Sequence, residues 1–122
     1  MKSGRILSLT ASVMASLCVP ALAAAPPSAT AVVGSDGTLV RGIAVTGAAH
    51  VDTGVYTVTF TSADVPTACA YTASVGSPDQ GVSEPLSLVN VGASDTAGTI
   101  QVYTYDKHAV AADRPFAVYV AC

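Results

Sequence analysis

The stretch Gly54-Val55-Tyr56-Thr57-Val58-Thr59-Phe60 (GVYTVTF) decides the fold, because large apolar side chains alternate in it with threonines. In an extended strand, Tyr56, Val58 and Phe60 would share one face and the threonines would lie on the other. A period of two residues predicts a strand with one buried face, and the glycine marks the turn that precedes it.

The same alternation recurs on both sides of this stretch, in short segments separated by turn residues such as Ser35-Asp36-Gly37 and Asp52-Thr53-Gly54. No segment shows the spacing of apolar residues that a long helix requires. We therefore predict an all-β fold, an antiparallel β-sandwich or flattened barrel of seven to eight short strands closed by one disulfide. The predicted strands include 30–34, 38–41, 43–51 (with Val45 and Val51 on one face), 55–61 and 116–122.

The N-terminal residues have the pattern of a secretory signal peptide. A short positive head precedes an uncharged apolar run of 14 residues, Ile6 to Val19, and Ala21-Leu22-Ala23 provides a cleavage pattern. The run is shorter than the roughly 20 residues of a membrane-spanning helix, although an uncleaved anchor remains the alternative. We predict a signal peptide at 1–23, a flexible leader at 24–30 and a single β domain at 31–122. The product would be secreted, to the periplasm or the extracellular space, without membrane insertion.

The three cysteines support an exported protein. Cys18 lies inside the predicted signal peptide, so cleavage would leave Cys69 and the last residue, Cys122, in an oxidising compartment. Both would point inward by strand alternation, which favours an intramolecular disulfide. The alternative is that Cys122 pairs between chains.

The charge balance disfavours two classes of partner. Without residues 1–23 the chain keeps three cations against seven Asp and one Glu, so its formal charge falls from −3 to −5. An acidic surface repels phosphate backbones and anionic lipids, so nucleic acid and membrane surfaces are poor partner candidates. The three cations are Arg41, Lys107 and Arg114.

Two His–carboxylate pairs are close in sequence, His50 with Asp52 and Asp106 with His108. Residues two apart on a strand share a face, so either pair could orient a base or begin a metal site. A zinc site would need further ligands that the chain does not offer near these pairs. Both pairs also lie at strand-to-turn edges, where polar residues are common. We therefore predict no metal site, no cofactor and no catalytic residue.

A small secreted hydrolase is the alternative hypothesis. It would use one of the two His–Asp pairs or carboxylates from predicted turns that converge in space. No nucleophile motif such as G-x-S-x-G is present to support it. The candidate turn carboxylates are Asp64, Asp79, Glu84, Asp95 and Asp113.

Outward-facing tyrosines are the candidate binding residues. Tyr103, Tyr105 and Tyr119 fall on the strand faces opposite to the predicted core residues, where they could form a patch for a glycan or a protein. The alternatives are that they shield an edge of the sandwich or cover a second core face, and these are favoured over binding. Arg114 is a weaker candidate, because in Asp113-Arg114-Pro115-Phe116 it could instead pair across strands while Pro115 opens the closing strand.

Several stretches occur together in an order that resembles a known type of domain: SDGTLVRG at 35–42, TGVYTVTF at 53–60, CAYTA at 69–73, DRPF at 113–116 and VAC at 120–122. Their order is similar to a recurrent small β domain of exported bacterial proteins of uncharacterised function. The resemblance extends from Val32 to Cys122 and rests on the paired cysteines and the Gly-x-Tyr-x-Val-x-Phe strand. It implies no activity and no site residues. That strand is more loosely similar to strands of jelly-roll trimers such as C1q-like heads and phage tail-fibre tips.

Three functional hypotheses follow. The first is an exported, non-catalytic domain of unknown ligand, a binding or envelope-associated structural module that acts outside the cytoplasm. The second is the small hydrolase, and the third is a trimeric jelly-roll-like binding head. We expect an extracellular protein or glycan as partner, and a monomer in preference to a trimer.

Overall fold

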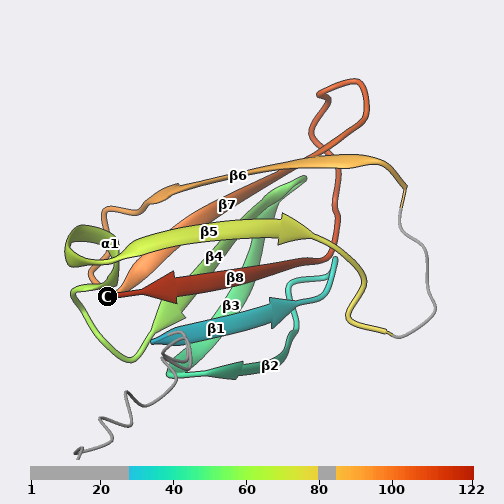
Figure 1. Ribbon diagram of the computed structural model, residues 1–122. Helices are drawn as coiled ribbons and strands as arrows, with labels where there is room; N and C mark the ends of the chain where they lie inside the picture. The colour runs from blue at the N-terminus through green and yellow to red at the C-terminus, as the bar shows by residue number, and fades with distance from the viewer. Residues whose placement is uncertain (1–27, 80–84) are drawn as a thin grey trace, which may run out of the picture.

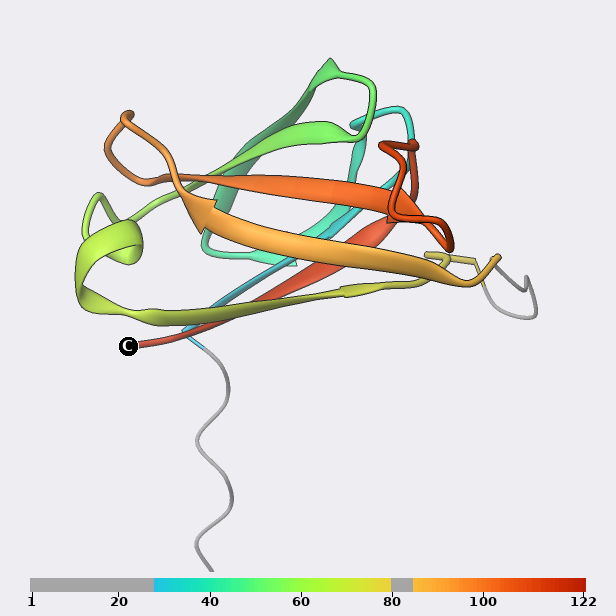
Figure 2. The same cartoon turned by 90° about the horizontal axis from the view of Figure 1, so that it is seen from above.

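Eight strands in the described residues form two four-stranded antiparallel sheets that lie face to face (Figures 1 and 2). This computed structural model describes residues 28–79 and 85–122. Sheet A has the order β2-β1-β8-β5 and sheet B the order β3-β4-β7-β6, and they do not close into a barrel. The predicted β-sandwich is confirmed. The strands are β1 (Ala29–Val33), β2 (Leu39–Ile43), β3 (Val45–Asp52), β4 (Val55–Phe60), β5 (Ala70–Val75), β6 (Ser87–Ala93), β7 (Thr99–Asp106) and β8 (Phe116–Ala121).

The core lies between the inner faces of the two sheets. Tyr56, Val58 and Phe60 of β4 are buried, as their alternation predicts. The ring of Tyr56 meets the ring of Phe116 from sheet A edge to face, with centroids 5.0 Å apart. The other buried apolar residues come from both sheets and from the start of the short helix α1 (Val65–Ala68); they are Ala29, Ala31, Val33, Val65, Ile100, Val102, Val118 and Val120.

The segment 43–51, predicted as one strand, is divided between the two sheets. Ala44 has a positive φ of 53° and carries the chain from β2 in sheet A to β3 in sheet B. An irregularity between Val45 and Gly47 then shifts the register of β3 against β4. As a result Val45 packs against the core whereas Val51 is 60% exposed. The prediction that these two side chains share a face is wrong, because a bulge reverses the alternation.

The first strand begins earlier than expected. Ala29, assigned from the sequence to the flexible leader, belongs to β1 together with Thr30, and the two residues pair with Val120 and Tyr119 of β8. Ser28 extends this pairing, because its backbone N–H donates to the Val120 carbonyl at 2.9 Å. The predicted signal peptide and the remainder of the leader lie outside the described residues.

A disulfide joins Cys69 to Cys122, with their Cα atoms 4.2 Å apart. Cys69 precedes β5 and Cys122 follows β8, so the bridge continues the register that pairs Ala70 with Ala121. The intramolecular pairing is confirmed. The prediction that both cysteines point inward holds only for Cys69, which packs against the core. Cys122 is exposed at the end of the sheet.

The disulfide is compatible with an oxidising, extracytoplasmic compartment. Within residues 28–79 and 85–122, no helix has the length and apolar character needed to cross a membrane.

Candidate functional site

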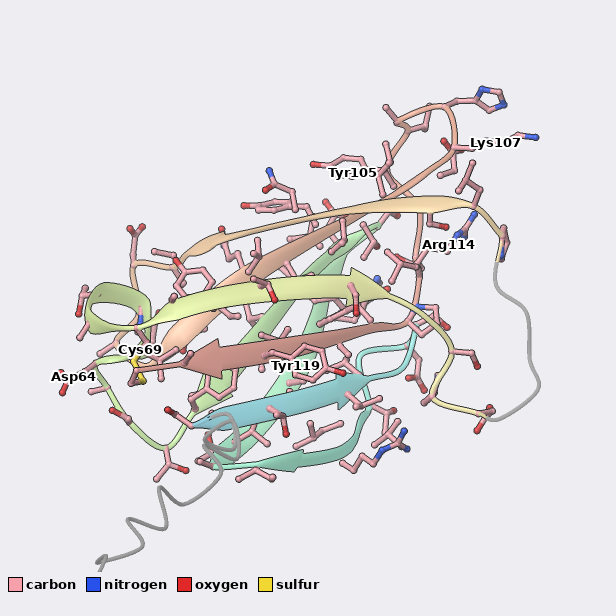
Figure 3. All side chains as sticks on the ribbon, viewed as in Figure 1. Asp64, Cys69, Tyr105, Lys107, Arg114 and Tyr119 are labelled. Atoms are coloured by element: carbon pink, nitrogen blue, oxygen red, sulfur yellow. A yellow bond between two sulfur atoms is a disulfide. The ribbon has the colours of Figure 1, made fainter. Side chains whose placement is uncertain are left out.

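The three candidate tyrosines do not form one patch, because they lie on opposite outer faces of the sandwich (Figure 3). Tyr119 projects from the front of β8 on the outer face of sheet A, where it is 51% exposed. Tyr103 and Tyr105 belong to β7 on the outer face of sheet B and are half-buried. The hydroxyl of Tyr103 donates to Gln101 Oε1 at 2.6 Å, and Tyr105 stands opposite Leu88 of β6. Only Tyr119 presents a largely exposed ring.

A shallow depression of about 360 Å³ adjoins Tyr119 on the outer face of sheet A. Its volume lies at the lower end of the range for small-ligand sites. Ile43, Thr30 and Tyr119 are direct cross-strand partners on β2, β1 and β8, so they form one row on the same face. The full lining is Thr30, Val32, Arg41, Gly42, Ile43 and Tyr119.

Arg41 is the only charged residue in the four strands of sheet A. It pairs with Val32 of β1, which places it in the row next to that of Tyr119. Within the described residues, Arg41 Nη1 donates to the Pro78 carbonyl oxygen at 3.5 Å, which is long for a hydrogen bond. Arg41 is an exposed residue that lines the depression, and its guanidinium offers five N–H donors.

Arg114 has a structural role at the entrance to β8. Its Nε donates to Ser87 Oγ of β6 at 2.9 Å, and its Nη1 donates to the Asp113 carbonyl at 2.9 Å. The following Pro115 precedes β8, whose first residue, Phe116, is buried. Arg114 therefore connects the segment before β8 to β6 through hydrogen bonds that occupy part of its guanidinium.

A second cluster, centred on His50 and Asp113, lies at the end of the sandwich where β8 begins. Asp113 Oδ1 accepts a hydrogen bond from the Gly54 backbone N–H at 2.6 Å and contacts His50 Nε2 at 2.9 Å. Both side chains are about one-third to two-fifths exposed. The N–H of Gly54, followed by His50, lowers the pKa of Asp113, because both stabilise the carboxylate.

Tyr56 ties a third segment to this cluster. Its hydroxyl donates to the Ser35 carbonyl at 2.6 Å, and its ring lies 5.1 Å from that of His50. Burial, with a smaller contribution from the charge of Asp113, raises the pKa of Tyr56 to about 12. The cluster thus joins the β1–β2 turn, the β3–β4 turn and the segment before β8. We call these contacts of His50, Asp113, Tyr56, Ser35 and Gly54 the entry latch.

The two His–carboxylate pairs that are close in sequence make hydrogen bonds to other groups. Asp52 Oδ1 accepts from the N–H of Thr53 at 2.7 Å, while His50 reaches Asp113 instead. Asp106 Oδ1 accepts the backbone N–H groups of His108 and Val110, which closes the loop after β7 and lowers the pKa of Asp106. Carboxylates near turns commonly bond to the local backbone, and both Asp52 and Asp106 do so.

The turn carboxylates do not assemble into a metal site in the described part of the chain, where no three His, Cys, Asp or Glu side chains gather. Asp113 joins the entry latch, and Glu84 lies outside the described residues. None of the lining residues of the depression is acidic. The two histidines are likewise absent from that lining.

Sequence reasoning identified Tyr119 but missed Arg41, Ile43 and Thr30 as its neighbours. These residues lie on three strands, and β8 is nearly 80 positions from β2 in the chain. The available signal was local: Arg41 and Ile43 are two apart in a strand and so share a face. Their proximity to Tyr119 required the strand order of sheet A. No protein-family model, curated protein or solved structure matches this chain.

Proposed function

We propose that the protein is an exported, non-catalytic binding module, and that it holds an extracellular glycan on the outer face of sheet A. The observation that carries this proposal is the depression, where an exposed aromatic ring and a solvent-facing guanidinium stand beside a floor of small side chains. Aromatic rings in concave, mostly uncharged sites commonly pack against the C–H faces of sugar rings.

The export in this proposal rests on the sequence. The signal-peptide pattern at 1–23 and the resemblance to small exported bacterial β domains both point outside the cytoplasm. The disulfide agrees with that location.

The hydrolase hypothesis receives less support than the binding module. Its best structural candidate, His50 with Asp113, is occupied in the entry latch by the Gly54 backbone and the ring of Tyr56. Its position at the end of the sandwich also separates it from the lining of the depression.

A glycan array probed with the wild-type protein and two tyrosine variants tests the proposal. We expect glycan binding that Tyr119→Ala weakens by roughly threefold to tenfold, the loss that fits one aromatic contact. Tyr105→Ala, which removes a tyrosine from the outer face of sheet B, is the matched control and should bind as the wild type does. Thermal unfolding confirms that both variants are folded.

Two outcomes would contradict the proposal. One is a wild-type protein that binds no glycan on the array. The other is glycan binding that Tyr119→Ala leaves intact while Tyr105→Ala abolishes it, which would place the site on sheet B.

A further inference from the structure

We propose that the depression is selective for acidic saccharides, with the carboxylate of a hexuronate residue on Arg41 and the apolar face of its ring on Tyr119. This inference rests on the proposed glycan-binding function and names the class of glycan.

The charge distribution supports an anionic ligand. The chain is acidic overall, yet the four strands of sheet A contain no Asp or Glu and a single cation, Arg41. Arg41 is thus the one charged group among these strands, and its positive charge can attract an anion to them. The planar guanidinium also matches the geometry of a carboxylate, which it can bind through two parallel N–H groups.

The strand geometry supports a ligand of one to two sugar rings. Arg41 lies on β2 and Tyr119 on β8, with β1 between them, so their strands are about 10 Å apart. The side chains between them, Thr30 and Val32, are short and form the floor. A carboxylated sugar ring, or two linked rings, can reach both the guanidinium and the aromatic ring across this floor.

The size of the site favours a small ligand over a folded protein. A stable protein interface buries about 800 Å² on each partner and involves 20 or more residues. The depression has six lining residues, which is enough to contact a compact ligand and far fewer than such an interface requires.

Calorimetric titration of the purified protein with trigalacturonate and with its methyl ester tests the inference. The ester keeps the sugar rings and removes their charge. We expect the acid to bind at least about tenfold more tightly than the ester, as one charge-assisted contact would provide. Raising the salt concentration should weaken binding of the acid and leave binding of the ester unchanged.

Variants of Arg41 and Tyr119 show which residue is responsible for the preference for the acid over the ester. Arg41→Gln should abolish the preference for the acid over the ester while leaving weak binding of both. Arg41→Lys should restore part of the preference, because the charge returns without the planar fork. Tyr119→Ala should weaken binding of the acid and of the ester by the same factor. Lys107→Gln removes a cation from the β7–β8 loop, away from the depression, and is the matched control for charge (Figure 3).

The results that would overturn the acidic preference differ from those that would overturn the proposed glycan binding. Equal affinities for the acid and the ester, both weakened by Tyr119→Ala, would refute the acidic preference and leave the glycan-binding function standing. Failure to bind trigalacturonate would refute the inference, while the array would still decide the function. If Lys107→Gln weakens binding of the acid as much as Arg41→Gln does, the attraction is a general charge effect and the assignment to Arg41 is wrong.

Discussion

Asp113 joins two parts of the chain that are distant in sequence. Its carboxylate binds the backbone of Gly54 in the β3–β4 turn and the ring of His50 in β3, immediately before β8 begins. Gly54 has a positive φ of 67°, and a Cβ at this position would come within 2.5 Å of the Thr104 carbonyl oxygen, so glycine is required for this close approach. Asp52 is the carboxylate near His50 in the sequence, whereas the carboxylate that His50 contacts is 63 residues away.

The lowered pKa of Asp113 predicts a pH-dependent contribution to stability. Its pKa in the folded state is below the ordinary value of 3.8, so the ionised carboxylate stabilises the fold above that value, and the contribution is lost as pH falls through the folded pKa. We expect Asp113→Asn to lower the free energy of unfolding by roughly 0.5–1 kcal/mol near neutral pH, since the pair is partly exposed. The difference from wild type should close once the pH has fallen below the lowered pKa of Asp113.

Urea unfolding at a series of pH values measures this difference. Asp95→Asn, which removes a carboxylate from the loop between β6 and β7, is the charge-matched control. An Asp113→Asn difference that stays constant down to the lowest pH would show that the carboxylate charge does not contribute.

At the scale of elements, β8 is fixed at both ends. The entry latch holds the segment before Phe116, and the Cys69–Cys122 disulfide holds the residue after Ala121. Between these points β8 pairs with β1 on one side and β5 on the other. The disulfide therefore attaches β5, an edge strand of sheet A, to an inner strand.

Loss of the disulfide should destabilise this pair of strands in particular. The bridge closes a separation of 53 residues, for which the chain-entropy relation gives a stabilisation of roughly 4 kcal/mol. We expect the double variant Cys69→Ser/Cys122→Ser to melt at a lower temperature and to lose amide protection first in β5 and β8. Hydrogen exchange together with thermal unfolding measures both effects.

Reduced wild-type protein is the matched control for the double variant, because it lacks the same bond and keeps both sulfur atoms. The two should behave alike. A double variant that melts at the same temperature as the oxidised wild type would show that the bridge adds little to the pairing of β5 with β8.

Elements with uninterrupted alternation were predictable from sequence, and irregular ones were not. In β4 and β8 the buried residues follow a strict period of two, so both the strands and their inner faces could be identified. At β2 and β3 the chain changes sheet at Ala44, a residue without the usual glycine or proline signal of a break. The disulfide could be predicted from two cysteines in a small domain, whereas the depression depends on strand order, which local patterns do not encode.

At the scale of the whole molecule, the exposed apolar side chains are distributed over separate surfaces. Ile43 and Tyr119 lie on the outer face of sheet A, Leu88 lies on that of sheet B and Val110 lies in the β7–β8 loop. A jelly-roll trimer would instead bury one continuous apolar face between its chains.

This distribution predicts a monomer. Size-exclusion chromatography with light scattering should give the mass of one chain, at most 12.1 kDa. A mass three times as large would support the trimeric-head hypothesis instead. Tyr119→Ala would then show whether sheet A forms the interface, because it should shift the mass toward that of a single chain.

The pairing of β1 with β8 also determines how the molecule would respond to a pulling force. The N–H of Ser28 bonds to Val120, and the N–H of Cys122 donates to Ser28 Oγ at 3.1 Å, so Ser28 and Cys122 lie side by side. Tension between these two residues would load the bonds of the antiparallel pair one after another, beginning at this end, as in opening a zipper. The disulfide would pass the load on the C-terminal side to β5. Detachment of β1 would therefore need less force than shearing the same strands along their length.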